Sequence, residues 1–548
     1  MNPALFMKAN LWYHGQKREG GGQMLHLLLG TDWTANRDEV MKRIAADVAG
    51  RRGNRILMVP ELISHETERR LCAAAGDTAS RYAEVLSFTR LARRVADSMG
   101  SAAEECLDNG GRVVAMAAAA KNLSSRLKAY AAVETKPEFL TGLIDAVDEF
   151  KRCCISSADL SRAAGETEGS LAQKLEELSL LMESYDALCS RGKRDPRDQM
   201  TWLLEQMEQG DFAREHVFYI DGFPDFTRQH LAILEHLIQA SPDVTVSLNC
   251  DRESSHLLAF EKAGDTASQL LRCARRAGVD VQIEIIPEKR LPLSPVRERL
   301  FQGVISSGAA KECLDVFRAE SPYLECMGAA ERIRGLLAAG CRCRDITVVC
   351  TDMTVYQPLV NLVFHRLHIP VYQSGTEDIL QKSVIATVLM ALDAALSGFD
   401  QKSVLRYLRS ALSPVDPDTC DRIENYAIIW GIRGQKWTQS WENHPDGLSG
   451  VWTEDDQRRM EELNTARELA IAPLTRLWQG FRDASDLRGQ ILALYGFLED
   501  ISLEMRLSRM AQELDAAGDN RGAQILNQLW EILLGALEQM YDMLGDTH

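Results

Sequence analysis

An aspartate stands where a buried strand of the predicted fold ends, a position at which α/β proteins often do their chemistry. Residues 217–220, Val-Phe-Tyr-Ile, lead into Asp221, and Gly222 and Pro224 precede a periodic apolar pattern. This order predicts a buried strand, a turn and a helix. Because ligands gather at the carboxyl ends of parallel strands, Asp221 is well sited to meet a nucleotide, a metal ion or a nucleic acid. Capping of the next turn or helix is the alternative role for this carboxylate.

A loop near the N-terminus has the layout of a phosphate-binding loop without its residues. The apolar run 24–29 ends at Gly30, and a helical pattern begins a few residues later. In a phosphate-binding loop, backbone N–H groups and the helix N-terminus cradle the phosphates. Where that motif requires a second glycine, a lysine and a hydroxyl, this chain has Ala35, Asn36 and Arg37. The β and γ phosphates and Mg²⁺ then lack their usual partners, so we expect this loop to have lost ATP.

Length and composition limit the class of protein. A chain of 548 residues is too long for a single core. No uninterrupted apolar run is long enough to span a membrane, and a net charge of −17 argues against an indiscriminately basic nucleic-acid binder. The 13 cysteines are scattered and lack the spacing of a zinc site. We therefore expect a soluble cytoplasmic protein with reduced thiols and no metal–thiolate site.

The order of apolar runs predicts an α/β protein with helical insertions. We expect strands at residues 24–29, 55–59, 83–88, 217–220, 244–249, 281–286 and 346–350. Between and after them the pattern is helical. The predicted parts are a disordered leader (1–23), the first part of a phosphate-loop-like α/β domain (24–111), an inserted helical subdomain (112–210), the rest of the first α/β domain (211–320), the start of a second α/β domain (321–378) and a C-terminal helical subdomain (379–548).

Three clusters of basic residues could line a groove that follows the phosphates of a nucleic acid. The alternative is that each cluster is the solvated face of a helix. The clusters are Arg90, Arg93 and Arg94; Arg191, Lys193, Arg194 and Arg197; and Arg272, Arg275 and Arg276.

Six short segments carry a family resemblance. They are residues 29–30 with the degenerate loop, 57–61, 84–92, 220–227, 344–349 and 421–434. In this order they resemble the AddB family, the B subunits of bacterial AddAB helicase–nucleases, from about residue 24 to the C-terminus. The resemblance implies an α/β fold of the inactivated superfamily 1 helicase type, with RecA-like parallel sheets and with inserted and C-terminal helical subdomains.

The resemblance implies that this chain has neither catalytic residues nor a metal site. Active helicases of this superfamily hold Mg²⁺ with the aspartate of an Asp-Glu pair and activate water with the glutamate. Here Asp221 is kept, and Gly222 stands at the glutamate position. The degenerate nucleotide site then consists of Gly30, Ala35, Asn36, Arg37 and Asp221.

The role implied instead is to grip the single DNA strand that leaves a partner motor and to scan it for a recombination hotspot. Strand ends offer phosphate donors beside aromatic faces on which bases stack, although core packing is the alternative for each phenylalanine. Leu62 stands where the family usually has a glutamine, and Thr351 where it commonly has an arginine, so we expect hotspot reading to be altered or lost. The residues expected to face the strand are Pro60, Glu61, Ser64, His65, Ser87, Phe88, Arg90, Phe223, Asp225 and Phe226.

The implied partners are single-stranded DNA and an AddA-like helicase–nuclease subunit, without a membrane. Family members end in a RecB-type nuclease domain that binds Mg²⁺ and, in many members, a 4Fe–4S cluster held by four cysteines. Residues 451–548 contain no cysteine and resemble neither feature. We therefore expect Mg²⁺ and the cluster only in a nuclease domain beyond this chain, which is expected to stop about midway through such a protein.

Two other functions are compatible with the same residues. An active nucleotide-dependent enzyme of the phosphate-loop type would need a lysine from elsewhere, and Lys42 and Lys17 are poorly placed for that role. A scaffold that binds the partner subunit without touching DNA is the third interpretation.

Overall fold

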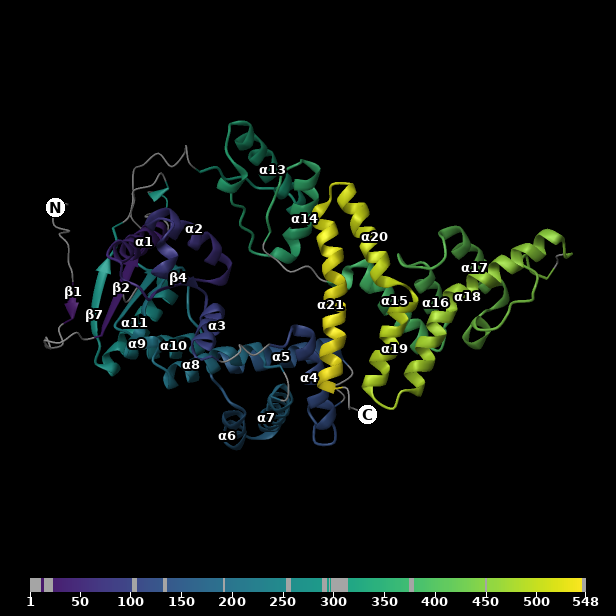
Figure 1. Ribbon diagram of the computed structural model, residues 1–548, viewed down its shortest axis with the longest axis horizontal. Coiled ribbons are helices and arrows are strands. Elements are labelled where there is room, and N and C mark those ends of the chain that lie inside the picture. The colour runs from purple at the N-terminus through teal and green to yellow at the C-terminus, as the bar shows by residue number, and fades with distance from the viewer. Residues whose placement is uncertain are drawn as a thin grey trace. The chain divides into compact units, whose positions relative to one another are not determined.

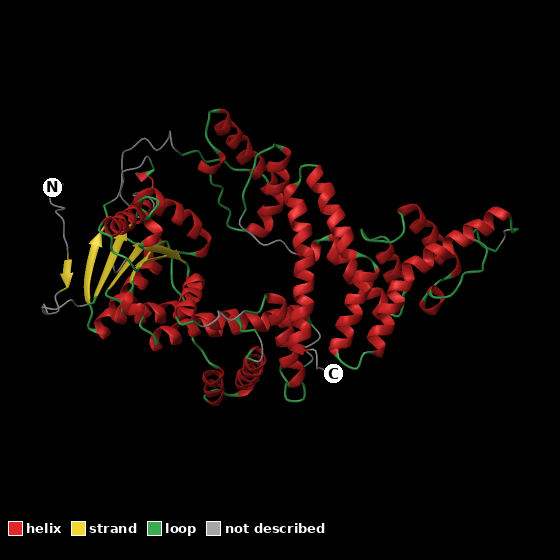
Figure 2. Cartoon of the chain, in the orientation of Figure 1, coloured by secondary structure: helices red, strands yellow, loops and turns green. Residues whose placement is uncertain are grey.

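The structure is a computed structural model that falls into two units (Figures 1 and 2). The units are Met1–Lys289 with Lys382–His548, and Arg290–Gln381. The described residues are 11–13, 23–100, 106–131, 136–190, 193–252, 258–287, 293–294, 296, 314–373, 379–448 and 451–544.

The first unit contains a mixed sheet in which six neighbouring strands are parallel (Figure 1). The strand order is β1-β7-β2-β6-β5-β3-β4. All six strands predicted within the first α/β domain are present, with ends that shift by a few residues. The strands are β1 (Leu11–Tyr13), β2 (Met24–Gly30), β3 (Arg55–Met58), β4 (Ala83–Leu86), β5 (Val217–Ile220), β6 (Asp243–Asn249) and β7 (Asp280–Ile285).

Strand β1 lies within the segment for which the sequence predicts a disordered leader. Leu11–Tyr13 pair antiparallel with β7, so the structure differs from the prediction at these three residues. A strand this short depends on its partner rather than on its own sequence, which explains why no local pattern revealed it. Residues 1–10 and 14–22 of the predicted leader lie outside the described residues.

Helices cover both faces of the parallel strands. Alternate residues of β2 point to opposite sides: Leu28 joins a core with α1 and α2, whereas Leu25 and Leu27 join a second core with α3, α8, α10 and α11. Buried on both faces, the strands are nearly continuous apolar runs, as is typical of parallel sheets. The helices are α1 (Trp33–Ala49), α2 (Ser64–Ala75), α3 (Phe88–Ser98), α8 (Gln199–Gln209), α9 (Phe212–Glu215), α10 (Arg228–Ala240) and α11 (Glu261–Ala277).

A run of helices separates β4 from β5 in the sequence. Its helices α4 (Asn109–Asn122), α5 (Pro137–Arg152), α6 (Ser157–Gly165) and α7 (Gly169–Cys189) enclose an apolar core of their own. A short 3₁₀ helix, η3 (Pro196–Asp198), leads into α8. Although α8 falls within the predicted insertion, its Leu203 and Met207 pack in the core of the sheet.

The C-terminal part of the first unit is helical, and its helices share one further core. Tyr407, Tyr426 and Trp437 are fully buried there. Among the residues that the structure describes, no helix combines the length and the apolar character needed to cross a membrane. The helices are α15 (Ser383–Leu396), α16 (Gln401–Leu408), α17 (Pro417–Trp430), α18 (Glu454–Asp483), α19 (Leu487–Asp500), α20 (Leu503–Ala516) and α21 (Asn520–Leu544).

The second unit contains two described helices, α13 (Pro322–Ala338) and α14 (Met353–Arg366), around a small core. The strand predicted at residues 346–350 is wrong, since this segment is a loop in which Val349 is 86% exposed. A strand needs a neighbour to satisfy its backbone N–H and C=O groups. No other strand is found among residues 314–373. The apolar sequence of this segment therefore predicted a strand, but the described part of this unit provides no second strand to pair with it.

Candidate functional site

The carboxyl ends of β2, β3, β4, β5 and β6 meet at one edge of the sheet, because these strands are parallel and adjacent. Gly30 at the end of β2 lies beside Asn249 at the end of β6. Met58 of β3 lies between Ile220 of β5 and Leu86 of β4. The structure thus brings the degenerate nucleotide loop and the residues predicted to face DNA to the same edge.

The start of α1 is capped by the chain itself. Asp32 accepts hydrogen bonds through its side chain from the N–H groups of Thr34 (3.0 Å) and Ala35 (3.4 Å), and through its C=O from Asn36 (3.0 Å). In a phosphate-binding loop, N–H groups at this position would point at the phosphates. Here the N–H groups already have an anionic partner, and the Asp32 carboxylate opposes a second negative charge by Coulomb repulsion.

Asn36 fills the space inside the loop. Its Nδ2 donates to the C=O of Gly30 (3.1 Å) and to that of Leu248 (3.0 Å), and the residue is 1% exposed. A Cβ atom added to Gly30 would lie 2.0 Å from Asn36 Oδ1, so only glycine admits this approach. The asparagine therefore joins β2 and β6 at the position that the motif reserves for its lysine.

Arg37 and Asp221 form a buried ion pair. Arg37 Nε donates to Asp221 Oδ2 at 3.2 Å, and the two side chains are 6% and 7% exposed. The guanidinium also lies 4.5 Å from the ring centre of Trp33. The positive charge that Mg²⁺ would bring to Asp221 thus comes from Arg37.

ATP with Mg²⁺ does not fit the residues at this loop. The N–H donors are capped, the lysine position holds a hydrogen-bonded asparagine and the aspartate is paired. Lys42, considered as a substitute lysine, is 77% exposed and pairs with Glu39 at 3.2 Å. Lys17 lies outside the described residues. The residues present therefore support no catalytic step through a nucleotide.

The residues predicted to face DNA lie at the ends of β3, β4 and β5, but they differ in exposure. Ser64, Ser87 and Phe88 are buried, which leaves little of their side chains for a strand to touch. The Ser87 hydroxyl donates to the Glu61 carboxylate and accepts from the N–H of Arg90, so it holds this part of the edge together. The more accessible members are Glu61, His65 and Asp225, which are exposed, and Pro60, Arg90, Phe223 and Phe226, which are half-buried.

Aromatic rings connect the end of β4 to the loop after β5. Phe88 stacks on His230 with ring centres 4.1 Å apart, and Phe223 lies edge-on to Phe88 at 5.5 Å. Phe226 packs against Phe223 at 5.1 Å. Burial lowers the pKa of His230 to about 4, so this ring is neutral near pH 7. Phe88 is therefore packed in the core, whereas Phe223 and Phe226 are partly exposed.

Several predicted basic residues have acidic partners, which reduces the positive field of each cluster. Arg90 pairs with Glu68 at 2.7 Å, Arg94 with Glu84 at 3.0 Å and Arg276 with Glu235 at 2.7 Å. Arg191 of the second cluster lies outside the described residues. A partner at the surface weakens a phosphate-binding role without removing it, since exposed ion pairs exchange readily.

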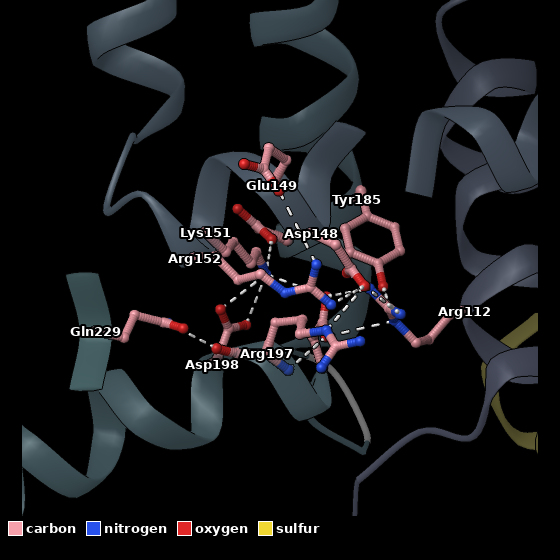
Figure 3. A network of polar contacts seen from close by, with 11 residues as sticks. Arg112, Asp148, Glu149, Lys151, Arg152, Tyr185, Arg197, Asp198 and Gln229 are labelled. Atoms are coloured by element: carbon pink, nitrogen blue, oxygen red, sulfur yellow. Dashed lines mark hydrogen bonds and ion pairs between the residues drawn. The ribbon is translucent and has the colours of Figure 1, made fainter. Parts of the chain in front are cut away.

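Sequence reasoning missed a buried ionic network in the helical insertion. Figure 3 shows Arg112, Asp148, Lys151 and Arg197 turned toward one another. Lys151 Nζ contacts Asp186 and Asp198, each at 2.8 Å, and Asp195 at 3.2 Å.

Arg112 extends this network from α4 to α5 and α7. It pairs with Asp148, lies 3.4 Å from Asp195 and donates to the Tyr185 hydroxyl at 3.2 Å. Arg197, which the sequence placed in a basic cluster, donates instead to Asp148 at 2.8 Å. Every charge of these residues has an opposite partner, so the network leaves little charge for a ligand.

The pKa values in the network follow from burial and from these partners. For Asp195, burial alone raises the pKa, but Lys151 and the other donors outweigh it and the net pKa lies below its usual value. For Asp198, burial outweighs Lys151 and raises the pKa. Burial also raises the pKa of the nearby Cys189 thiol to about 12, so this cysteine stays protonated at neutral pH.

The site contains residues that no sequence motif singled out. Asp32, Trp33 and Asn249 complete the nucleotide loop and its surroundings. The sequence contained a signal for Asn249, because it is a polar residue at the end of the predicted strand 244–249. Trp33 offered no such signal, because a tryptophan at the start of a helix is most simply interpreted as core.

A sheet with six parallel strands and helices on both faces is consistent with a helicase-like α/β fold. Residues 27–296 match the family model described as ADDB, N-terminal. Curated relatives whose names describe them as the B subunits of ATP-dependent helicase/deoxyribonucleases match about nine-tenths of the chain. These matches support membership of the AddB family.

Three of these relatives show the extent of the similarity. The protein of Clostridium acetobutylicum is 25% identical in an alignment 510 positions long, which covers 90% of this chain and 44% of that protein. The protein of Geobacillus kaustophilus is 28% identical in an alignment of 541 positions, which covers 93% of this chain and 46% of that protein. The protein of Desulforudis audaxviator is 28% identical in an alignment of 520 positions, which covers 90% of this chain and 45% of that protein. The chain thus spans less than half of the length of these relatives, whose names describe them as parts of a complex.

Proposed function

We propose that this chain is the helicase-like part of a B subunit in a helicase–deoxyribonuclease complex that acts in double-strand break repair and recombination. In this role it holds the single DNA strand delivered by a partner motor subunit of the AddA type, and it does not hydrolyse ATP itself. The names of the relatives support membership of such a complex. The absence of ATP chemistry and the contact with DNA are inferred from the site.

The observation that carries the proposal is the closed nucleotide loop. Asp32 takes the N–H groups of Thr34 and Ala35, Asn36 bonds to Gly30, and Arg37 neutralises Asp221. Phosphates that bound at these N–H groups, at Asn36 Nδ2 or at the Arg37 guanidinium would have to break the bonds that these groups already make inside the chain. The edge is therefore a passive surface rather than a motor.

The DNA-binding part of the proposal is supported by the other half of the same edge. Phe223 and Phe226 offer half-exposed rings, and Arg90 and His65 lie within reach of a strand at the neighbouring strand ends. Aromatic stacking combined with phosphate contacts is the usual means of gripping single strands without a fixed sequence.

The test measures ATP hydrolysis and oligonucleotide binding by the purified chain. We expect no hydrolysis above the background, with or without single-stranded DNA. We expect oligonucleotide binding that weakens as salt rises, since each phosphate contact contributes a slope of about −0.7 in log K against log salt for single strands. Hydrolysis that depends on Asp221 would instead support an active phosphate-loop enzyme. A lack of oligonucleotide binding at low salt would support a scaffold that binds only the partner subunit.

A further inference from the structure

A small pocket lies beside the closed loop, at the ends of β5 and β6. Its volume is about 210 Å³, and its lining includes Trp33, Phe223, Ser247 and Asn249. Pockets that enclose drug-sized ligands measure roughly 300–1,000 Å³. This pocket is too small for a nucleoside triphosphate, but it has room for a single planar ring system.

Trp33 is held as one wall of this pocket. Its neighbour Arg37 covers the ring at 4.5 Å from the centroid, and the Asp221 carboxylate fixes Arg37 in turn. Trp33 nevertheless remains 57% exposed. A large aromatic side chain held at a pocket rim, with so much of its surface open, offers a ready stacking face.

Phe223 belongs both to this pocket and to the aromatic group at the end of β4. It lines the pocket, and its ring contacts Phe88 and Phe226. The pocket is therefore continuous with the surface that we propose for the DNA strand.

Asn249 supplies polar recognition at the pocket wall. With its amide nitrogen turned to the loop, it donates to the C=O of Gly30 (3.0 Å) and to that of Thr31 (3.2 Å). Its amide oxygen is then an acceptor on a wall that Asn36, Asp221 and Ser247 also line, and such an oxygen can accept from the exocyclic amino group of adenine or cytosine.

We propose that this pocket is a base-binding slot that takes one unstacked base of a single DNA strand between Trp33 and Phe223, with Asn249 at its edge. The proposal rests on the proposed function, because the base belongs to the strand held at the same edge. The internal hydrogen bonds and the ion pair that keep phosphates from binding to the nucleotide loop also hold Trp33 in place. The former nucleotide site thus selects the base and rejects the phosphates.

The test compares two single-stranded oligonucleotides of equal length, one carrying bases that include 2-aminopurine and one fully abasic. We expect the native chain to bind the base-bearing strand more tightly and to quench the 2-aminopurine fluorescence. Trp33→Ala should lower affinity for the base-bearing strand roughly fivefold to 100-fold, as expected for one lost stack. It should leave the affinity for the abasic strand unchanged, and Trp33→Phe should keep most of the affinity.

Trp452→Ala is the matched control, since Trp452 is 45% exposed and lies in the C-terminal helical part. It should change neither affinity, and thermal unfolding should show that each variant folds. If the native chain binds neither strand, the proposed function fails and the slot fails with it. If the native chain binds and Trp33→Ala binds both strands as the native chain does, or loses affinity for both equally, the slot is overturned while the proposed function stands.

Discussion

The two buried arginine–aspartate clusters of the first unit are built differently. In the insertion, Lys151 contacts three carboxylates, and Arg112 contacts two. At the sheet edge, Arg37 pairs with one carboxylate, that of Asp221, and the pair borders a pocket. Several partners for each charge are what a fold needs to bury charge without a large penalty. The pair at the strand end instead has one partner for each charge and borders a pocket lined by Asp221.

The largest predicted effect is the loss of stability when one carboxylate is removed from the network in the insertion. Asp195 is fully buried between Arg112 and Lys151. Asp195→Ala leaves both cations short of a partner, and we expect the free energy of opening of the insertion to fall by about 3–5 kcal/mol. Hydrogen exchange of the α4, α5 and α7 amides measures this free energy.

The control for this prediction is Asp211→Ala, because Asp211 and Arg214 form an ion pair at 2.8 Å with side chains about 70% exposed. Exposed pairs contribute about 0–1 kcal/mol. An Asp195→Ala variant that opens no more easily than Asp211→Ala would show that the network does not stabilise the insertion.

Breaking the pair at the sheet edge should cost less, because water in the pocket can reach Asp221. We expect Arg37→Met to destabilise the α/β part by about 3 kcal/mol, at the low end for a broken buried pair. The double variant Arg37→Met, Asp221→Asn removes the unpaired charge and should recover part of this loss. Thermal unfolding of both variants measures the difference. A double variant that is less stable than the single variant would contradict the conclusion that Arg37 and Asp221 serve to neutralise each other.

Acid should weaken the aromatic group at the end of β4. Burial lowers the pKa of His230 to about 4, whereas the unfolded chain has the ordinary value near 6.5. Stability from the neutral ring is therefore complete above about pH 6.5 and is lost as the pH falls toward 4. Between pH 7.5 and pH 5, the free energy of unfolding of the native chain should fall by about 2 kcal/mol more than that of His230→Phe.

Unfolding at both pH values measures this effect. His65→Phe is the control, since the His65 side chain is 88% exposed and its ring should not report on burial. Equal acid sensitivity of His230→Phe and the native chain would mean that the neutral ring makes no contribution.

The smallest expected effect concerns the exposed charges of the edge. Arg90→Glu should lower affinity for a single-stranded oligonucleotide several-fold and reduce the salt slope by about 0.7–1, the value of one phosphate contact. The fold should remain intact, because Arg90 and its partner Glu68 are 40% and 37% exposed. Fluorescence anisotropy at three salt concentrations measures both quantities. Arg214→Glu, remote from the edge, is the charge-matched control, and an equal loss in both variants would remove Arg90 from the site.

Much of the α/β architecture could be predicted from the sequence, because it is local. Strands such as 217–220 are short apolar runs closed by turn residues, and that pattern also places Asp221 at a strand end. The prediction failed where pairing decides the outcome. Residues 346–350 have the pattern of a strand and find no partner in their unit, whereas Leu11–Tyr13 showed no strand pattern and pair with β7.

The site was only partly predictable, for the same reason. The strand, loop and helix order at residues 24–37 is visible in the sequence, so the predicted nucleotide loop could be located. Arg37 and Asp221, however, are 184 residues apart in the sequence, and no local pattern predicts that they form an ion pair. The exposure of Trp33 and the burial of Ser87 and Phe88 likewise depend on tertiary packing.

The central claim is that the chain's own side chains close the nucleotide loop. Calorimetric titration of the purified chain with ATP and Mg²⁺ tests it most directly, over the roughly micromolar to millimolar range in which enzymes meet their substrates. No saturable binding is expected anywhere in this range. Stoichiometric binding that requires Mg²⁺ and is lost in Asp221→Asn would contradict it, because Asp221 would then serve a metal ion rather than Arg37.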